Sequence, residues 1–125
     1  MGQNKLRIET GGIDLECTLN ETKTSLKLLN LLPISATASK WGDEIYFPIP
    51  LEVELEEGGS DVVESGDIAY WPPGNAFCIF FGKIPASTND EIRATSPVIP
   101  LGTVNGDEKV FQSIRSGENI TISRR

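Results

Sequence analysis

The chain has 125 residues, of which 38% are hydrophobic and 23% are charged, and this balance is typical of a globular protein rather than a disordered or membrane protein. Because the length suits one domain, we expect residues 1–125 to form a single domain. Eleven Lys and Arg residues against 18 Asp and Glu residues leave a net charge of −7. A negative field repels phosphate backbones, which argues against nucleic acid as a partner.

The N-terminal residues lack the apolar run of a secretory signal, and no later run is long enough to span a membrane. We therefore expect a cytoplasmic protein with no membrane partner. Cys17 and Cys78 lie far apart in apolar, strand-like surroundings. Both are expected to be reduced, buried side chains rather than the two halves of a disulfide.

Short β-prone stretches, separated by Gly, Pro and Asp residues, run through most of the chain. The first two flank Gly11-Gly12, a pair that supplies the positive φ angles of a tight hairpin turn. In chain order, the expected strands and strand-like stretches are Lys5–Thr10, Ile13–Leu19, Ile34–Trp41, Glu44–Ile49, Leu51–Glu56, Asp67–Trp71, Ala76–Phe81, Val98–Val104 and Asn119–Ser123.

Two helices are predicted between these stretches. Asn20 can cap the first helix, in which Leu26, Leu29 and Leu32 are spaced for one apolar face. Asp107 can cap a second, shorter helix just before the last strand.

The most distinctive part of the sequence surrounds Pro73-Gly74. These two residue types suit the central positions of a type II turn, so we expect a hairpin here. The run Ala76–Phe81 contains no polar residue, so both of its faces need cover from the interior of the fold, a helix or a partner. In Leu51–Glu56, by contrast, aliphatic and carboxylate residues alternate, so one side of that strand should meet water.

Several familiar chemistries are excluded because the chain contains no histidine. Ser-His-Asp and Cys-His triads, histidine-based zinc sites and the commonest general base all need that residue. The sequence also has no Gly-rich phosphate loop and no closely spaced cysteine pair. Glu52, Glu54 and Glu56 are interpreted as a solvated strand face rather than a cation site. We therefore expect no cofactor and no bound metal.

The remaining candidates for a functional site are aromatic and charged residues. Aromatic side chains with a polar group can either complete a core or line a pocket. Arg93 could present its rigid donor fork to a carbonyl or carboxylate, or it could form an ordinary ion pair with Glu91. The candidate ligand-binding residues are Trp41, Tyr46, Trp71, Phe80, Glu91 and Arg93.

The stretch Gly66–Gly82 resembles the small, stand-alone prokaryotic cyclophilin-like domains. Shorter pieces fit the same family in the same order, namely Trp41–Phe47, Glu91–Arg93 and Ser96–Val98, followed by Gly102. The resemblance implies a mainly β fold, a closed cyclophilin-like β-barrel of about eight strands with two helices capping its ends. It transfers no catalytic residue to this chain by position.

These features predict a binding module without strong catalysis, in which a pocket near Trp71, Tyr46 and Arg93 accepts a peptide or a small ligand. The alternative is a peptidyl-prolyl cis-trans isomerase, in which Arg93 is the catalytic candidate and donates to the prolyl nitrogen or carbonyl. A third alternative is a structural subunit of a larger assembly, such as a homo-oligomer, which predicts a large exposed apolar patch.

Overall fold

The structure is a computed structural model that describes residues 4–53, 59–82 and 92–124. These residues form ten strands, one α-helix and two short 3-10 helices, so the prediction of a mainly β fold is confirmed. The elements are β1 (Lys5–Thr10), β2 (Ile13–Leu19), α1 (Lys23–Leu31), β3 (Ile34–Thr37), β4 (Ser39–Trp41), β5 (Glu44–Pro48), β6 (Ser60–Val63), β7 (Asp67–Trp71), η1 (Pro72–Gly74), β8 (Ala76–Phe80), β9 (Ile92–Asn105), η2 (Glu108–Ser113) and β10 (Asn119–Arg124).

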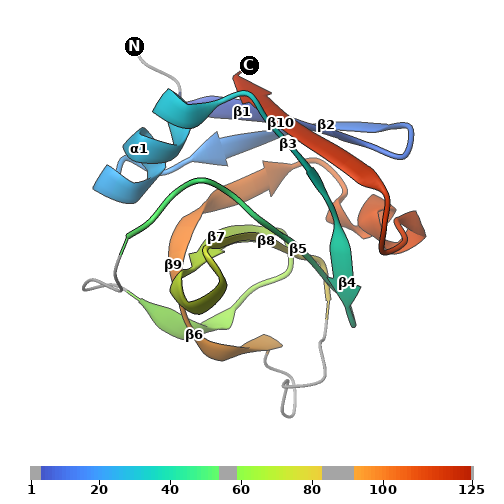
Figure 1. The fold of residues 1–125 in the computed structure, drawn as a ribbon. Helices are drawn as coiled ribbons and strands as arrows, with labels where there is room; N and C mark the ends of the chain where they lie inside the picture. Colours follow the sequence, from blue (N-terminus) through green and yellow to red (C-terminus); the bar gives the residue numbers. More distant parts are fainter. Residues whose placement is uncertain (1–3, 54–58, 83–91, 125) are drawn as a thin grey trace.

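One antiparallel sheet curls around the molecule (Figure 1). Its strands follow the order β3-β10-β1-β2-β9-β7-β8-β5-β4, and β6 pairs with β9 beside this path. The two end strands, β3 and β4, follow one another in the chain with only Ala38 between them. The NH of Ala38 donates to the carbonyl of Glu118 at 2.8 Å, and the NH of Gly117 donates to the carbonyl of Ala38 at 2.8 Å. In the described strands the sheet is therefore not closed by hydrogen bonds, so the predicted closed barrel is not confirmed.

The first hairpin is confirmed with its predicted boundaries. Strands β1 and β2 pair up to Thr10 and Ile13, on either side of the glycine pair, and both glycines have positive φ angles. The predicted strand 34–41 instead divides into β3 and β4, because these two parts pair with β10 and β5 respectively. The predicted strand 51–56 is wrong over Leu51–Val53, which has no regular structure, and its remaining residues lie outside the described ranges.

Helix α1 begins later than predicted and turns a different face inward. Thr22, not Asn20, is its N-cap and accepts from the NH of Ser25. The hydroxyl of Ser25 donates to the side chain of Asn20 and to the carbonyl of Leu101, which fixes Ser25 against the sheet. Leu28 therefore shares the buried face and Leu26 is 47% exposed, so the predicted apolar face is wrong at that position. No helix in the described ranges is long and apolar enough to cross a membrane.

The β7–β8 hairpin is confirmed, but its turn is not type II. The turn is the 3-10 helix η1, and the left-handed residue is Asn75 (φ 48) rather than Gly74. The Asn75 amide donates to the hydroxyl of Tyr70 at 2.8 Å and to the carbonyl of Leu51 at 3.2 Å. These bonds favour the asparagine side chain at the left-handed position.

The second predicted helix is also a 3-10 helix. Asp107 caps η2 as expected, since its carboxylate accepts from the NH of Lys109. Phe111 and Ile114, at the end of η2, are buried in the main core together with Leu28 and Leu29 of α1. Figure 1 shows α1 and η2 on opposite sides of the molecule.

Strand β8 separates two hydrophobic clusters. Phe77 and Ile79 belong to the larger cluster, the main core, whereas Ala76, Cys78 and Phe80 belong to a smaller one, which we call the second cluster. Every residue of β8 is buried, so the prediction that both faces of this run are covered is confirmed. Cys17 and Cys78 are both free and buried, as expected.

The long strand β9 connects the two clusters. Its later part contributes Ile99 and Leu101 to the main core, and its earlier part contributes Ile92, Ala94 and Val98 to the second cluster. The register of β9 against β7 shifts between Ile68 and Ala69. The sequence predicted this strand only from Val98 onward, so its first six residues are an addition to the prediction.

The close approach of β9 to β2 makes a glycine necessary at position 102. A Cβ on Gly102 would lie 1.9 Å from the carbonyl oxygen of Thr18, far inside van der Waals contact.

We expect Gly102→Ala to lower the free energy of unfolding by more than about 3 kcal/mol in urea denaturation, since the backbone of one strand must move. Gly117→Ala is the control, because Gly117 also has a positive φ (+98) but has no atom near the added Cβ. Its loss should be about 1 kcal/mol, and equal losses in the two variants would contradict the role of the Thr18 contact.

Candidate functional site

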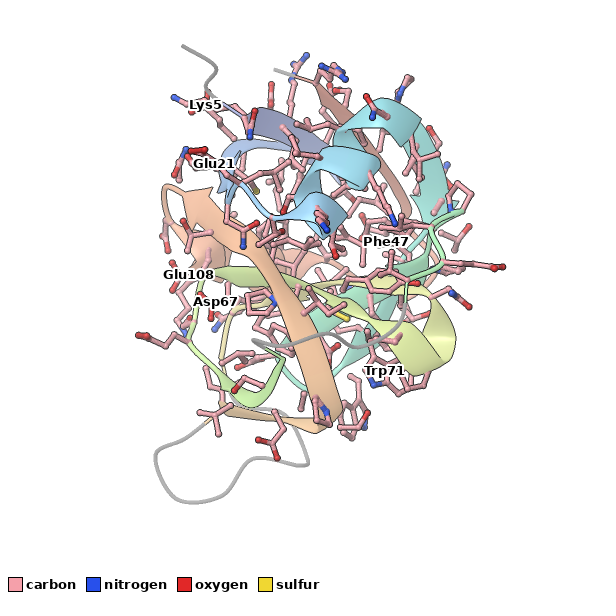
Figure 2. The ribbon with its side chains drawn as sticks, turned by 90° about the vertical axis from the view of Figure 1, so that its left-hand side faces the viewer. Lys5, Glu21, Phe47, Asp67, Trp71 and Glu108 are labelled. Carbon is pink, nitrogen blue, oxygen red and sulfur yellow. The ribbon has the colours of Figure 1, made fainter. Side chains whose placement is uncertain are left out.

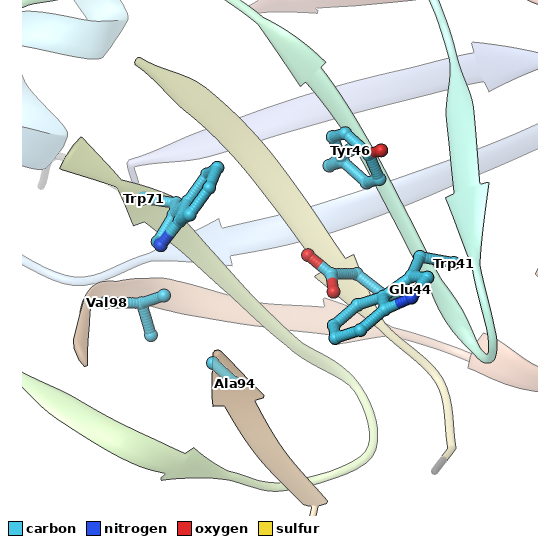
Figure 3. A pocket seen from close by; sticks show the side chains of 6 residues that line it. All are labelled: Trp41, Glu44, Tyr46, Trp71, Ala94 and Val98. Atoms are coloured by element: carbon cyan, nitrogen blue, oxygen red, sulfur yellow. The ribbon is translucent and has the colours of Figure 1, made fainter. Parts of the chain in front are cut away.

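A pocket of about 200 Å³ opens beside the second cluster (Figure 3). Strands β4, β5, β7 and β9 supply its lining. The lining residues are Trp41, Glu44, Tyr46, Trp71, Ala94 and Val98. In Figure 2 the indole of Trp71 lies in the lower part of the molecule, away from Lys5 and β1 at the top.

The ladder between β4, β5 and β8 places the site residues on one face of the sheet. Glu44 lies opposite Trp41 of β4 on one side and opposite Phe80 of β8 on the other. Tyr46, two residues along β5, lies opposite Cys78. Because residues opposite each other in an antiparallel ladder project to the same face, all five side chains point toward the pocket side.

The predicted aromatic candidates thus come together from separate strands. Trp41, Tyr46 and Trp71 line the pocket. Phe80 is fully buried in the second cluster beneath them and does not line the pocket. Phe80 lies on the same face of the sheet as Glu44 because the two residues are opposite each other in the ladder.

Trp71 is held on both sides. Its indole NH donates to the hydroxyl of Ser96 in β9 at 2.7 Å. On the other side the backbone of Gly74 approaches so closely that a Cβ there would lie 2.7 Å from two atoms of the indole. The polar end of the ring is satisfied by the protein, and the rest of the ring is an apolar wall with a fixed orientation.

The two charged candidates are only partly described. Glu91 lies outside the described residues. Arg93 lies in β9 opposite Val62, but its side chain is also outside the described residues. Its chain neighbours Ile92 and Ala94 both belong to the second cluster. The ion pair considered for Glu91 and Arg93 stays a prediction.

Glu44 is the site residue that the sequence did not reveal. It is 7% exposed and is the only buried carboxylate among the described residues. Burial among apolar groups raises the pKa of Glu44 to about 7, and the side chain of Cys78 on the adjacent strand acts in the opposite direction. The sequence carries no local signal for this burial, which follows from the pairing of Glu44 with Phe80 on the wholly buried strand β8.

Cys78 is unsuited to nucleophilic chemistry. It is 1% exposed, and burial together with the negative charge of Glu44 raises its pKa well above the ordinary value. A thiolate, which is the reactive form, is therefore strongly disfavoured. The described residues also contain no group of three or more side chains that could hold a metal ion. Among the described residues, the site combines apolar walls with the carboxyl group of Glu44 and the buried thiol of Cys78.

Comparison with known proteins agrees with this fold. A family model described as "Cyclophilin-like" matches residues 4–123. The chain belongs to the cyclophilin-like family. This cyclophilin-like domain is also similar to the solution structure of the hypothetical protein AF2241 from Archaeoglobus fulgidus, with 39% identity and a TM-score of 0.83 over 98% of this chain and 95% of that chain. No curated protein matches the chain. The resemblance inferred from Gly66–Gly82 is therefore confirmed.

The buried carboxyl group should make the stability of the domain depend on pH. Because the pKa of Glu44 rises from 4.5 to about 7 on folding, the folded state binds more protons than the unfolded state between these values. The favourable contribution of Glu44 to the free energy of unfolding is fully present below pH 4.5. It is lost as the pH rises through 7, and the free energy of unfolding falls by up to about 3 kcal/mol. Burial also raises the pKa of Asp67, so the wild type must be compared with Glu44→Gln. Urea denaturation at several pH values should show the two curves diverging above pH 4.5, and parallel curves would contradict a raised pKa.

Proposed function

We propose that this cyclophilin-like domain is a binding module, and that its pocket accepts a small ligand or one side chain of a peptide. The observation that carries the proposal is the arrangement of Trp41, Tyr46 and Trp71 around one concavity of about 200 Å³. A water molecule occupies about 30 Å³ in the liquid, so a compact group of several non-hydrogen atoms has room there. Ligand sites in proteins are usually apolar and aromatic with a few polar groups, as this pocket is.

The chemistry of the site supports binding rather than strong catalysis. The chain has no histidine, and the raised pKa keeps the Cys78 thiol protonated. Glu44 is then the titratable carboxyl group at the pocket. A carboxyl group beside rigid aromatic walls is suited to orienting a ligand.

The two tryptophans allow a direct test, because they are the only ones in the chain and both line the pocket. We expect 3,3-dimethyl-1-butanol and N-acetylproline amide, added at millimolar concentration, to shift both indole NH signals in ¹H–¹⁵N spectra. Molecules of this size are expected to saturate the pocket at millimolar concentration. If neither probe shifts either indole signal, the proposed binding function is wrong.

A variant that fills the pocket provides the control for this test. Ala94→Leu adds three carbons at a lining position and should abolish the indole shifts while the rest of the spectrum stays folded. Thr103→Leu is the matched control, since Thr103 is an exposed residue of the same strand. It should leave the shifts unchanged, and loss of the shifts in both variants would point to a general effect on folding.

The prolyl isomerase alternative depends on Arg93, whose backbone lies between two residues of the second cluster. Uncatalysed exchange of a prolyl bond takes tens to hundreds of seconds, so modest catalysis would be visible by exchange NMR on a short proline peptide. Under this alternative the peptide exchanges faster with the wild type, and Arg93→Ala abolishes the acceleration. If the peptide is not accelerated even at high protein concentration, the isomerase alternative is wrong and the binding module remains as the proposal.

The structural-subunit alternative has no specific support. Among the described residues, the large hydrophobic side chains with most exposure are Leu26, Val62 and Val110. They come from α1, β6 and η2, three separate elements. The oligomeric state stays a prediction to be measured.

A further inference from the structure

The pocket combines a buried carboxyl group with aromatic rings from three strands. Figure 3 shows the carboxyl group of Glu44 between the side chains of Trp41, Tyr46 and Trp71, with Ala94 and Val98 across the opening. Both tryptophans of the chain and one of its two tyrosines are gathered there. Aromatic faces carry partial negative charge, so the rings and the carboxylate present the same sign of potential to a ligand.

Among the described side chains, Lys40 and Lys109 are both engaged elsewhere, and the side chain of Arg93 lies outside the described residues. Lys40, next to Trp41, donates to the carbonyl of Gln112 at 2.8 Å and lies over the ring of Phe81. Lys109 donates to the carbonyl of Phe81 at 2.6 Å. Within the described part of the chain, the ion pairs are made by Lys5 and Arg7 and none involves Glu44. Burial of a carboxylate is costly, and the raised pKa of Glu44 expresses that cost.

We propose that the pocket is a site for a methylated ammonium cation, whose charge meets the Glu44 carboxylate while its methyl groups contact Trp41, Tyr46 and Trp71. This inference rests on the proposed binding function and names the class of ligand. Cation–π contacts contribute about 0.5 to 2 kcal/mol each when desolvated, and aromatic cages are a known way to bind quaternary ammonium groups. The net charge of −7 also favours the approach of a cation.

The lining argues against other cations. A hard metal ion needs six or more oxygen ligands, and the described residues contain no group of three ligating side chains. A primary ammonium is strongly hydrated and has three donors to satisfy, whereas the polar groups of the lining are the Glu44 carboxylate, the Tyr46 hydroxyl and the indole nitrogens of the tryptophans. An ammonium with methyl groups in place of those donors suits apolar walls such as Ala94 and Val98.

The test compares a cation with a neutral molecule of the same shape. Choline and 3,3-dimethyl-1-butanol differ in one atom, a positively charged nitrogen against a carbon. Both are titrated into the full chain at about pH 8, where Glu44 is mostly ionised, and the indole NH signals of Trp41 and Trp71 report binding. We expect choline to bind about tenfold more tightly than the alcohol.

Two variants locate the source of this preference. Glu44→Gln keeps the shape of the side chain and should lower the preference severalfold, because only the aromatic rings then attract the cation. Glu52→Gln removes one negative charge from an exposed position and should keep the preference. The ¹H–¹⁵N spectra also establish that each variant is folded. A preference as large in Glu44→Gln as in the wild type overturns the inference.

A lower pH gives an independent check. The titratable groups that face Glu44 from the described strands are Tyr46 on its own strand and Cys78 on β8, with Trp41, Trp71, Ala94 and Val98 on the remaining sides. Cys78 stays protonated because burial raises its pKa. Protonation of Glu44 should therefore weaken choline binding between about pH 8 and pH 6 without affecting the alcohol. A choline affinity that does not change with pH contradicts the inference.

The outcomes separate this inference from the proposed function. Equal affinities for choline and the alcohol overturn the cation site but leave a binding module, whereas no binding of either molecule rejects both. A short peptide with a central trimethyllysine distinguishes the two sources of the cation. Tighter binding of the peptide than of choline assigns the site to a modified side chain, and the reverse assigns it to a free metabolite of this chemistry.

Discussion

The fold depends on a strand that has no solvent side. Each residue of Ala76–Phe80 is buried, and alternate residues enter the main core and the second cluster. A strand of this kind cannot lie at the surface of a one-layer barrel, so a further layer of chain must cover its outer face. The early part of β9, paired with β6, provides that layer. The pocket is the space that this cover leaves open beside β4 and β5.

The same sheet holds the carboxyl group of Glu44 in a fixed position at the pocket. Glu44 is fixed by its ladder pairs with Trp41 and Phe80, both of which belong to a packed sheet rather than to a loop. Rigid strands hold a binding group more precisely than loops do. The group that destabilises the folded state at neutral pH is therefore the group best placed to orient a ligand, a conflict between stability and function that is common at sites.

Sequence reasoning succeeded where local patterns decide structure and failed where distant pairing decides it. The strands Lys5–Thr10 and Ile13–Leu19 were predicted to the residue, because a glycine pair and β-prone stretches are local signals. The early half of β9 was missed, since its cover of β8 depends on long-range packing. Among site residues, the tryptophans were found by type alone. Glu44 was not among the predicted site residues, and only its pairing with Phe80 reveals that its side of the strand is buried.

The junction at Ala38 determines how the two ends of the sheet are exposed. A sheet that ends in free strands offers unpaired NH and carbonyl groups to other chains, and long, flat edges invite aggregation. Here the two ends of the sheet path, β3 and β4, have four and three residues, and the chain passes directly from one to the other. Ala38, at the corner between them, directs its own NH and carbonyl to the Gly117–Glu118 turn. The shortness of these ends leaves few unpaired backbone groups to which a strand of another chain could pair.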